Sequence, residues 1–371
     1  MNLTEIKTTH FRSLLLGMLR AAYPRQAQLD YGAVFGTCVA RGQRLWREQL
    51  VPEFGVDKAP IFEKALWRAR MRAETSIPWP LGYGYAFGAA CHAIAGGKPE
   101  ERAAAATNSA LAMFLIGLFD HLLDKYPREF GDIGKLVSGN AIRLYTLERN
   151  LAGLAHNPEQ VLAAGFVDLY RLYFERCHRL LGPEQNSPVA QLWYASLVRM
   201  HAAESASLNL RISKVPPTKA LIEDSEAPGT ASSWIVGLSA CLGLNEAAVA
   251  QMEPFARNLN RLTRLVDSVV DVDDDIKQDL WGGLAVRLAL NAKDQASADR
   301  IMMSVAEECV ALLIELAEGP ASQLKLQAGD PFTLMDVLWA YLWSGAGGET
   351  PGWQPPSVAE LQAAAMSPAQ T

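Results

Sequence analysis

Apolar residues recur along most of this chain at intervals of three and four, the spacing that places side chains on one face of an α-helix. Alternating apolar and polar runs, which would indicate strands, are almost absent. Asn157-Pro158 and Ser187-Pro188 are typical helix starts, and Gly182-Pro183 and Gly319-Pro320 are typical helix ends. The pattern predicts helices over 3–21, 28–49, 57–74, 100–125, 129–150, 158–181, 188–212, 217–227, 230–242, 246–275, 283–291, 294–317 and 332–343.

No internal repeat and no low-complexity linker interrupts these segments. We therefore predict an all-α fold in which residues 1–345 form a single helical domain. The remaining residues, 346–371, contain Gly347-Gly348 and Pro355-Pro356, and we expect them to form a mobile tail.

The composition argues against several classes of protein. Of the 371 residues, 50% are hydrophobic and 20% are charged, enough to build a sizeable core. The net charge of −6 gives no overall basic surface for nucleic acid. The five cysteines form no CxxC pair, which argues against both a disulfide framework and a zinc site. No apolar run reaches about 18 residues and no cleavage pattern follows the first helix, so we expect a cytoplasmic protein without a transmembrane segment.

Two acidic clusters stand out from this apolar background. The first is Asp120-His-Leu-Leu-Asp124, and the second runs from Asp267 through Asp271 to Asp274 and Asp275. Positions four or seven apart share one face of a helix, so each cluster gathers like charges. At about 6 Å and an effective dielectric of about 20, each like-charged pair costs about 3 kcal/mol. Such faces favour a cation, and magnesium suits them because it takes hard oxygen ligands and shares them with substrate phosphates.

The surroundings of both clusters fit a phosphate and metal site. Arg264 lies within one turn of Asp267, and Lys277 follows the second cluster, so both are candidates to contact a diphosphate. The first cluster continues the apolar run 109–119, which favours a cavity inside the protein over solvent. The alternatives are a solvated helix end for the second cluster and a helix-end salt bridge for the first.

These motifs resemble the two metal motifs of the bacterial large-terpene synthases, the tetraprenyl-β-curcumene synthase type (class IB) within the class I isoprenoid synthase superfamily. The segments Glu226-Ala-Pro-Gly229-Thr and Leu192-Trp-Tyr resemble the helix break and the preceding cavity helix of that family. The likeness runs from about residue 105 to 283. Gly117 stands where the family usually has a further aspartate, and His121 where it has an amide.

The resemblance implies a helical bundle around a central cavity and a Mg²⁺-dependent lyase. The substrate would be a linear prenyl diphosphate, converted to a cyclic terpene with release of pyrophosphate. Catalytic residues would be Asp120, Asp124, Asp267 and Asp271, with Asp274 and Asp275 as further metal ligands. The reaction cavity would be lined by Phe114, Trp193, Tyr194, Gly229, Thr230 and Trp234, although each aromatic ring also suits ordinary core packing.

Two other functions fit the same residues. A squalene or phytoene synthase-like enzyme, which joins two prenyl chains head to head, also carries paired DxxxD-type motifs. A non-catalytic helical protein that binds prenyl lipids would retain the cavity without the chemistry. The sequence leaves substrate length and oligomeric state open, a homodimer included.

Overall fold

The computed structural model describes residues 3–68, 77–125, 158–182, 187–207, 209–325 and 331–347. Within these ranges the chain forms helices and two isolated bridges but no strand, which confirms the all-α prediction. The predicted helix 129–150 and most of the predicted tail lie outside the described residues. The helices are α1 (Thr9–Ala22), α2 (Tyr31–Arg44), α3 (Val51–Phe54), α4 (Ala59–Arg68), α5 (Pro78–Ile94), α6 (Arg102–Lys125), α10 (Pro158–Leu181), α11 (Pro188–Ser207), α12 (Lys219–Ser239), α13 (Glu246–Lys277), α14 (Gly283–Asn291), α15 (Gln295–Glu318) and α16 (Leu334–Gly345).

Four shorter elements complete the described chain. A π-helical turn, η3 (Leu45–Leu50), joins α2 to α3, and the single turns are η1 (Leu3–Glu5), η2 (Pro24–Gln28) and η5 (Pro320–Ser322). Side-chain hydrogen bonds cap the N-termini of several helices. Asn245 accepts a hydrogen bond from the backbone N–H of Ala248 at the start of α13, and Asp294 and Thr333 form capping boxes at α15 and α16.

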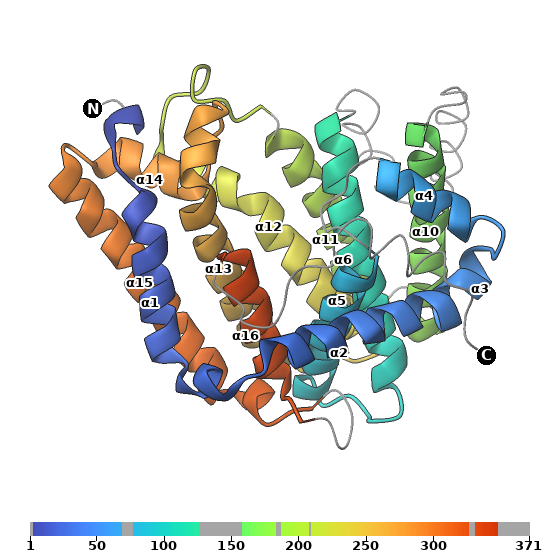
Figure 1. The fold of residues 1–371 in the computed structure, drawn as a ribbon. Helices are drawn as coiled ribbons and strands as arrows, with labels where there is room; N and C mark the ends of the chain where they lie inside the picture. Colours follow the sequence, from blue (N-terminus) through green and yellow to red (C-terminus); the bar gives the residue numbers. More distant parts are fainter. Residues whose placement is uncertain are drawn as a thin grey trace.

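Four central helices, α5, α6, α12 and α13, carry the core (Figure 1). On one side α13 packs against α15, which packs against α1, and on the other side α6 packs against α10, which packs against α4. Helix α16 packs on α5 and α2. A buried carboxylate ties the two ends of the described chain together, because Asp336 of α16 accepts hydrogen bonds from Tyr23 Oη at 2.8 Å and Arg25 Nε at 2.7 Å.

Among the described residues, one helix, α6, is long and apolar enough to span a membrane, judged by length and composition alone. Of its most apolar 18-residue window, 67% is buried inside the protein. That burial, with α5, α10 and α12 packed around it, is the environment of a core helix.

Candidate functional site

The second acidic cluster occupies the last turns of α13. Buried side chains at Leu265, Val266, Val269 and Val272 hold this part of the helix against its neighbours. Asp267, Asp271 and Asp274 are exposed, and Asp275 is partly buried. The carboxylates therefore share the free side of a helix that is otherwise fixed by packing.

Mutual repulsion and burial disfavour the charged forms of two of these carboxylates. Partial desolvation of its carboxyl group, followed by the negative charge of Asp267, raises the pKa of Asp271 to about 6. Burial, followed by the charges of Asp271 and Asp267, raises the pKa of Asp275 to about 7. Nearby Arg264 opposes both shifts without cancelling them. The folded protein thus holds excess negative charge at this end of α13 that a cation would neutralise.

Arg264 links the aspartates of α13 to helix α12. Its Nη1 donates to Asp267 Oδ2 at 3.0 Å. Its stem lies on Gly229, where a Cβ would stand 2.1 Å from Arg264 Cδ. Its Nε is buried without a hydrogen-bond partner among the described residues, so the guanidinium keeps donor capacity. The other predicted phosphate contact, Lys277, is 71% exposed and pairs with Asp274 at 3.1 Å.

Asp120 lies on the side of α6 that faces α5 and α12. It follows Ser109 by eleven residues and Met113 by seven, so all three share one helical face. Ser109 Oγ donates to the carbonyl of Val236 in α12 at 2.8 Å, and Met113 lies against Gly84 of α5. Asp120 itself is exposed, so its side chain reaches solvent at the end of this inward face. Asp124 continues α6, and its side chain lies outside the described part of the chain.

Packing contacts place Asp120 and Asp267 at the same height, measured along the helices from a shared level of contact with α12. Val236 of α12 bonds Ser109 of α6, and the next residue, Gly237, contacts Ala256 of α13, where a Cβ would be 3.5 Å from Ala256 Cβ. Asp120 and Asp267 each lie eleven residues further along their helices, a rise of about 16 Å in both cases. Figure 1 shows α6 and α13 ending at the same side of the molecule, the top in this view.

Beside Gly117 of α6, the described residues leave room at the level of Arg264. Gly117 lies eight residues after Ser109, and Arg264 lies eight residues after Ala256, so the two stand at one height. A Cβ at Gly117 would meet no atom within 4 Å among the described residues. Gly229, under Arg264, is two turns from Val236 and so lies on the side of α12 that faces α6. Arg264 therefore lies across the side of α12 that also carries the Val236 contact with α6.

A separate groove of about 800 Å³ lies between α11, α12 and α13. Thr230 and Trp234 line it together with Leu192 and Ser196, and Trp234 Nε1 donates to Ser196 Oγ at 3.1 Å. Ala227 lies two residues before Gly229, and Trp234 lies two residues before Val236. Two residues correspond to about 160° around the axis of α12. The groove is therefore on the side of α12 away from α6, and no aspartate of α6 or α13 is among its described lining residues.

The remaining predicted cavity residues lie elsewhere. Phe114 is 1% exposed and packs against Trp46 and Phe62. Trp193 is fully buried and donates to Tyr173 Oη at 2.9 Å, and the Tyr194 hydroxyl contacts His178. The structure does not bring these three rings together with the aspartates of α13.

The predicted helix ends at 227 and 230 are wrong, because α12 runs without a break from Lys219 to Ser239 with Pro228 inside it. Proline removes one backbone donor and weakens one turn, yet packing on α6, α11 and α13 holds the helix through it.

Asp279 follows Asp275 by four residues, but it does not share the carboxylate face of α13. It follows the end of the helix at a φ of 61° and accepts hydrogen bonds from Ser213 N and Oγ at 2.7 and 2.5 Å, which fixes the loop before α12.

The donor set fits magnesium bound in part by a substrate. Among the described residues, no three carboxylate, imidazole or thiol groups are arranged to enclose a metal ion. Mg²⁺ commonly takes one or two carboxylates and completes its shell with water and phosphate oxygens, so a closed protein cage is not required. Asp271 and Asp275 offer hard oxygens whose charges Arg264 does not balance, and Asp267 beside them is paired with Arg264.

Comparison of the chain with protein-family models, with curated proteins and with solved structures found no match. The resemblance to terpene synthases therefore depends on the motif residues alone.

Asp275→Asn should stabilise the metal-free protein at pH 8 by about 1–2 kcal/mol, and this gain should shrink as the pH falls to 5. The folded-state pKa of Asp275 is raised from the ordinary 3.8 to about 7, so ionising this carboxyl costs stability that grows as the pH rises from about 4 to 7 and is fully present above pH 7. Thermal unfolding of variant and wild type in EDTA at several pH values measures the difference. Buried histidines such as His201, with its pKa lowered to about 3, destabilise both proteins equally in acid and cancel. A gain that stays constant with pH would contradict the raised pKa.

Proposed function

We propose that this protein is a Mg²⁺-dependent class I terpene synthase that ionises a linear prenyl diphosphate, releases pyrophosphate and converts the carbocation to a terpene, most simply a cyclic one. The observation that carries the proposal is the equal height of Asp120 on α6 and Asp267 on α13, with Arg264 lying over α12, the helix that packs on both. Two carboxylate faces at one height with a guanidinium near them are suited to a metal-bound diphosphate.

Each group has a distinct role in this proposal. Asp120, Asp267 and Asp271, with Asp124 as the predicted fourth, would hold Mg²⁺, and Asp275 would add a ligand at the end of the face. Arg264 would donate from its free positions to phosphate oxygens. Bound Mg²⁺ supplies positive charge that stabilises the departing pyrophosphate. Ionisation then depends on water being kept from the carbocation by the apolar residues below the aspartates on α6.

The charge distribution supports a polyanionic ligand brought in with its metal. Without the metal, the aspartates repel one another and a diphosphate would be repelled as well. With Mg²⁺ bound, the same face becomes attractive to phosphate, and Arg264 adds a fixed donor. Lys277 is less well placed, because it is exposed and already paired with Asp274.

Incubation with linear prenyl diphosphates of increasing chain length tests the proposal. We expect Mg²⁺-dependent release of pyrophosphate and a terpene made from one substrate molecule, detected by gas chromatography of the organic extract. Two joined chains would instead identify a head-to-head prenyl transferase. Prenyl-lipid binding that is equal with and without Mg²⁺, with no pyrophosphate released at any length, would show a binding protein and overturn the proposal.

A further inference from the structure

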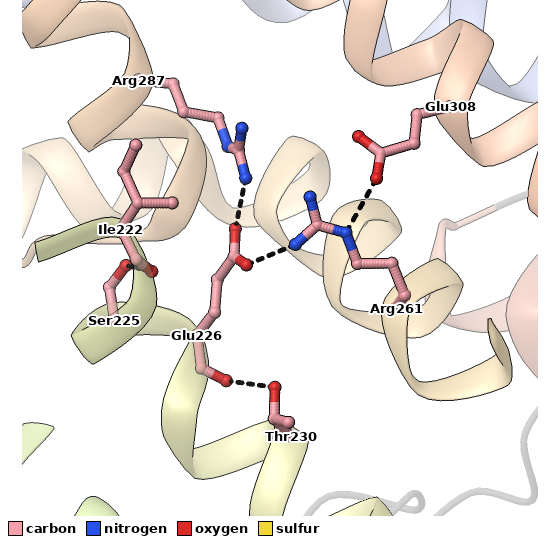
Figure 2. Close-up of polar contacts among 7 residues, drawn as sticks. All are labelled: Ile222, Ser225, Glu226, Thr230, Arg261, Arg287 and Glu308. Carbon is pink, nitrogen blue, oxygen red and sulfur yellow. Dashed lines mark hydrogen bonds and ion pairs between the residues drawn. The ribbon is translucent and has the colours of Figure 1, made fainter. Parts of the chain in front are cut away.

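Glu226 is a buried carboxylate at the meeting point of four helices. It is 8% exposed and accepts Arg261 Nη1 of α13 at 2.5 Å and Arg287 Nη2 of α14 at 3.0 Å. Arg261 Nε in turn donates to Glu308 Oε1 of α15 at 2.8 Å. Figure 2 shows the Glu226 carboxylate between the two guanidinium groups. Because a buried charge is stable only when it is paired, these bonds fix the relative positions of α12, α13 and α14.

The pairs hold α12 where its own hydrogen bonding is weakest. Pro228 has no N–H, so the carbonyl of Asp224 loses its normal partner one turn earlier. Glu226 lies midway between those two residues and is held from outside the helix by both arginines. The side-chain bonds therefore stabilise the turn that the proline weakens.

The same pairs set the contact between Arg264 and α12. Gly229 follows Glu226 by three residues, and Arg264 follows Arg261 by three residues. The two helices run antiparallel, with Gly237 against Ala256 and Thr230 against Asn260. The contacts of Arg261 and Arg264 with α12 both lie within one turn of each helix, so the bond between Glu226 and Arg261 restrains the turn of α12 on which Arg264 lies. Only a residue without a Cβ leaves room for Arg264 there, so a small shift of α12 would move the guanidinium.

A second path leads from Glu226 to the aspartates. A Cβ at Gly283, the first residue of α14, would lie 2.9 Å from Glu226 Oε1, and a Cβ at Gly282 would lie 1.9 Å from Asp275 Oδ2. Glu226 and Asp275 thus contact neighbouring residues at the start of α14. Displacement of α14 would change the surroundings of Asp275 directly.

We propose that Glu226 is a positioning residue of the diphosphate site, holding Arg264 through α12 and α13 and Asp275 through α14. This inference rests on the proposed function, because it gives Arg264 a ligand to hold. Glu226 lies outside the two aspartate clusters and acts through Arg261 and Arg287. Its removal would leave two guanidinium groups facing one another, and their repulsion would push α13 and α14 apart.

Glu226→Gln keeps the size of the side chain and removes its charge, and Glu308→Gln is the matched control. Glu308 bonds the same Arg261 but belongs to α15 and contacts neither α12 nor α14 through this network. Titration calorimetry with inorganic pyrophosphate at saturating Mg²⁺ measures the dissociation constant without requiring turnover. We expect Glu226→Gln to weaken pyrophosphate binding about tenfold or more, and Glu308→Gln to stay within about threefold of wild type.

The outcomes separate the two proposals. Wild-type protein that binds no pyrophosphate with Mg²⁺ would overturn the proposed function and this inference with it. If Glu226→Gln binds pyrophosphate within threefold of wild type, even with a lower Tm, then Glu226 has a purely structural role and the proposed function still stands. If Glu226→Gln does not fold, Arg287→Lys provides the test, because it keeps the charge but loses the guanidinium geometry and should weaken binding in the same direction.

Discussion

Asp120→Asn and Asp271→Asn should each lower pyrophosphate release from a prenyl diphosphate at least about 100-fold. Each change replaces one proposed oxygen ligand by a neutral amide on a carboxylate face at the same end of the bundle. Asp271→Asn should also leave the Tm of the metal-free protein unchanged or higher. The raised pKa of Asp271 means that the folded state disfavours the ionised carboxylate, and asparagine removes that charge. Circular dichroism and a pyrophosphate-coupled assay measure the two effects.

Asp273→Asn is the control for these variants. Asp273 belongs to the same acidic run, but its carboxylate accepts a hydrogen bond from the hydroxyl of Thr8, which precedes α1. It therefore points toward the N-terminal segment and away from Asp267 and Asp271. We expect turnover within about threefold of wild type and a loss of about 1 kcal/mol in stability from the missing hydrogen bond. Normal turnover in Asp120→Asn and Asp271→Asn would remove the metal site from the proposal.

Helix periodicity was sufficient to predict most of the described helices. The ranges 158–181, 246–275, 283–291 and 294–317 lie within two residues of α10, α13, α14 and α15. Three of them begin at a signal that the sequence shows, Pro158 for α10, Asn245 for α13 and Asp294 for α15. Local sequence determines such elements almost alone.

Helix α5 was missed, because its local sequence contradicts its final state. Residues 78–94 contain Pro78, Pro80, Gly82, Gly84 and Gly88, which in isolation indicate turns. The prolines fall in the first turn, where the missing N–H groups have no helical partner in any case. The glycines let α5 approach α2 and α6 closely, and burial of the whole helix offsets its poor propensity.

The site was predictable to the level of residue types and helices. The two aspartate faces and Arg264 follow from spacing, whereas the direction of each side chain does not. Asp279 follows Asp275 by four residues, yet the helix ends at Lys277 and leaves it in a loop. The pairing of Glu226 gave no signal, because its partners Arg261 and Arg287 are 35 and 61 residues away and only the tertiary fold brings them together.

Gly82→Ala should destabilise the protein by about 2–3 kcal/mol, although alanine is the better helix former. A Cβ at Gly82 would lie 2.1 Å from the carbonyl oxygen of Cys38 in α2, and one at Gly42 would lie 1.8 Å from that of Pro78. Because the obstacles are backbone atoms, α2 and α5 could accommodate the methyl group only by moving apart. Thermal unfolding of the purified variant measures the loss as a lower Tm.

Gly36→Ala in α2 is the matched control, and it should change stability in the opposite direction. Gly36 is exposed in the middle of the helix, and a Cβ there would meet no atom within 4 Å among the described residues. Alanine then restricts the unfolded chain without straining the folded one, which stabilises by about 0.5–1 kcal/mol. Opposite signs at Gly82 and Gly36 would show that close packing of α2 on α5, and not helix propensity, requires the glycines. A rise in Tm for Gly82→Ala would instead mean that the two helices cross with more space than the structure gives them.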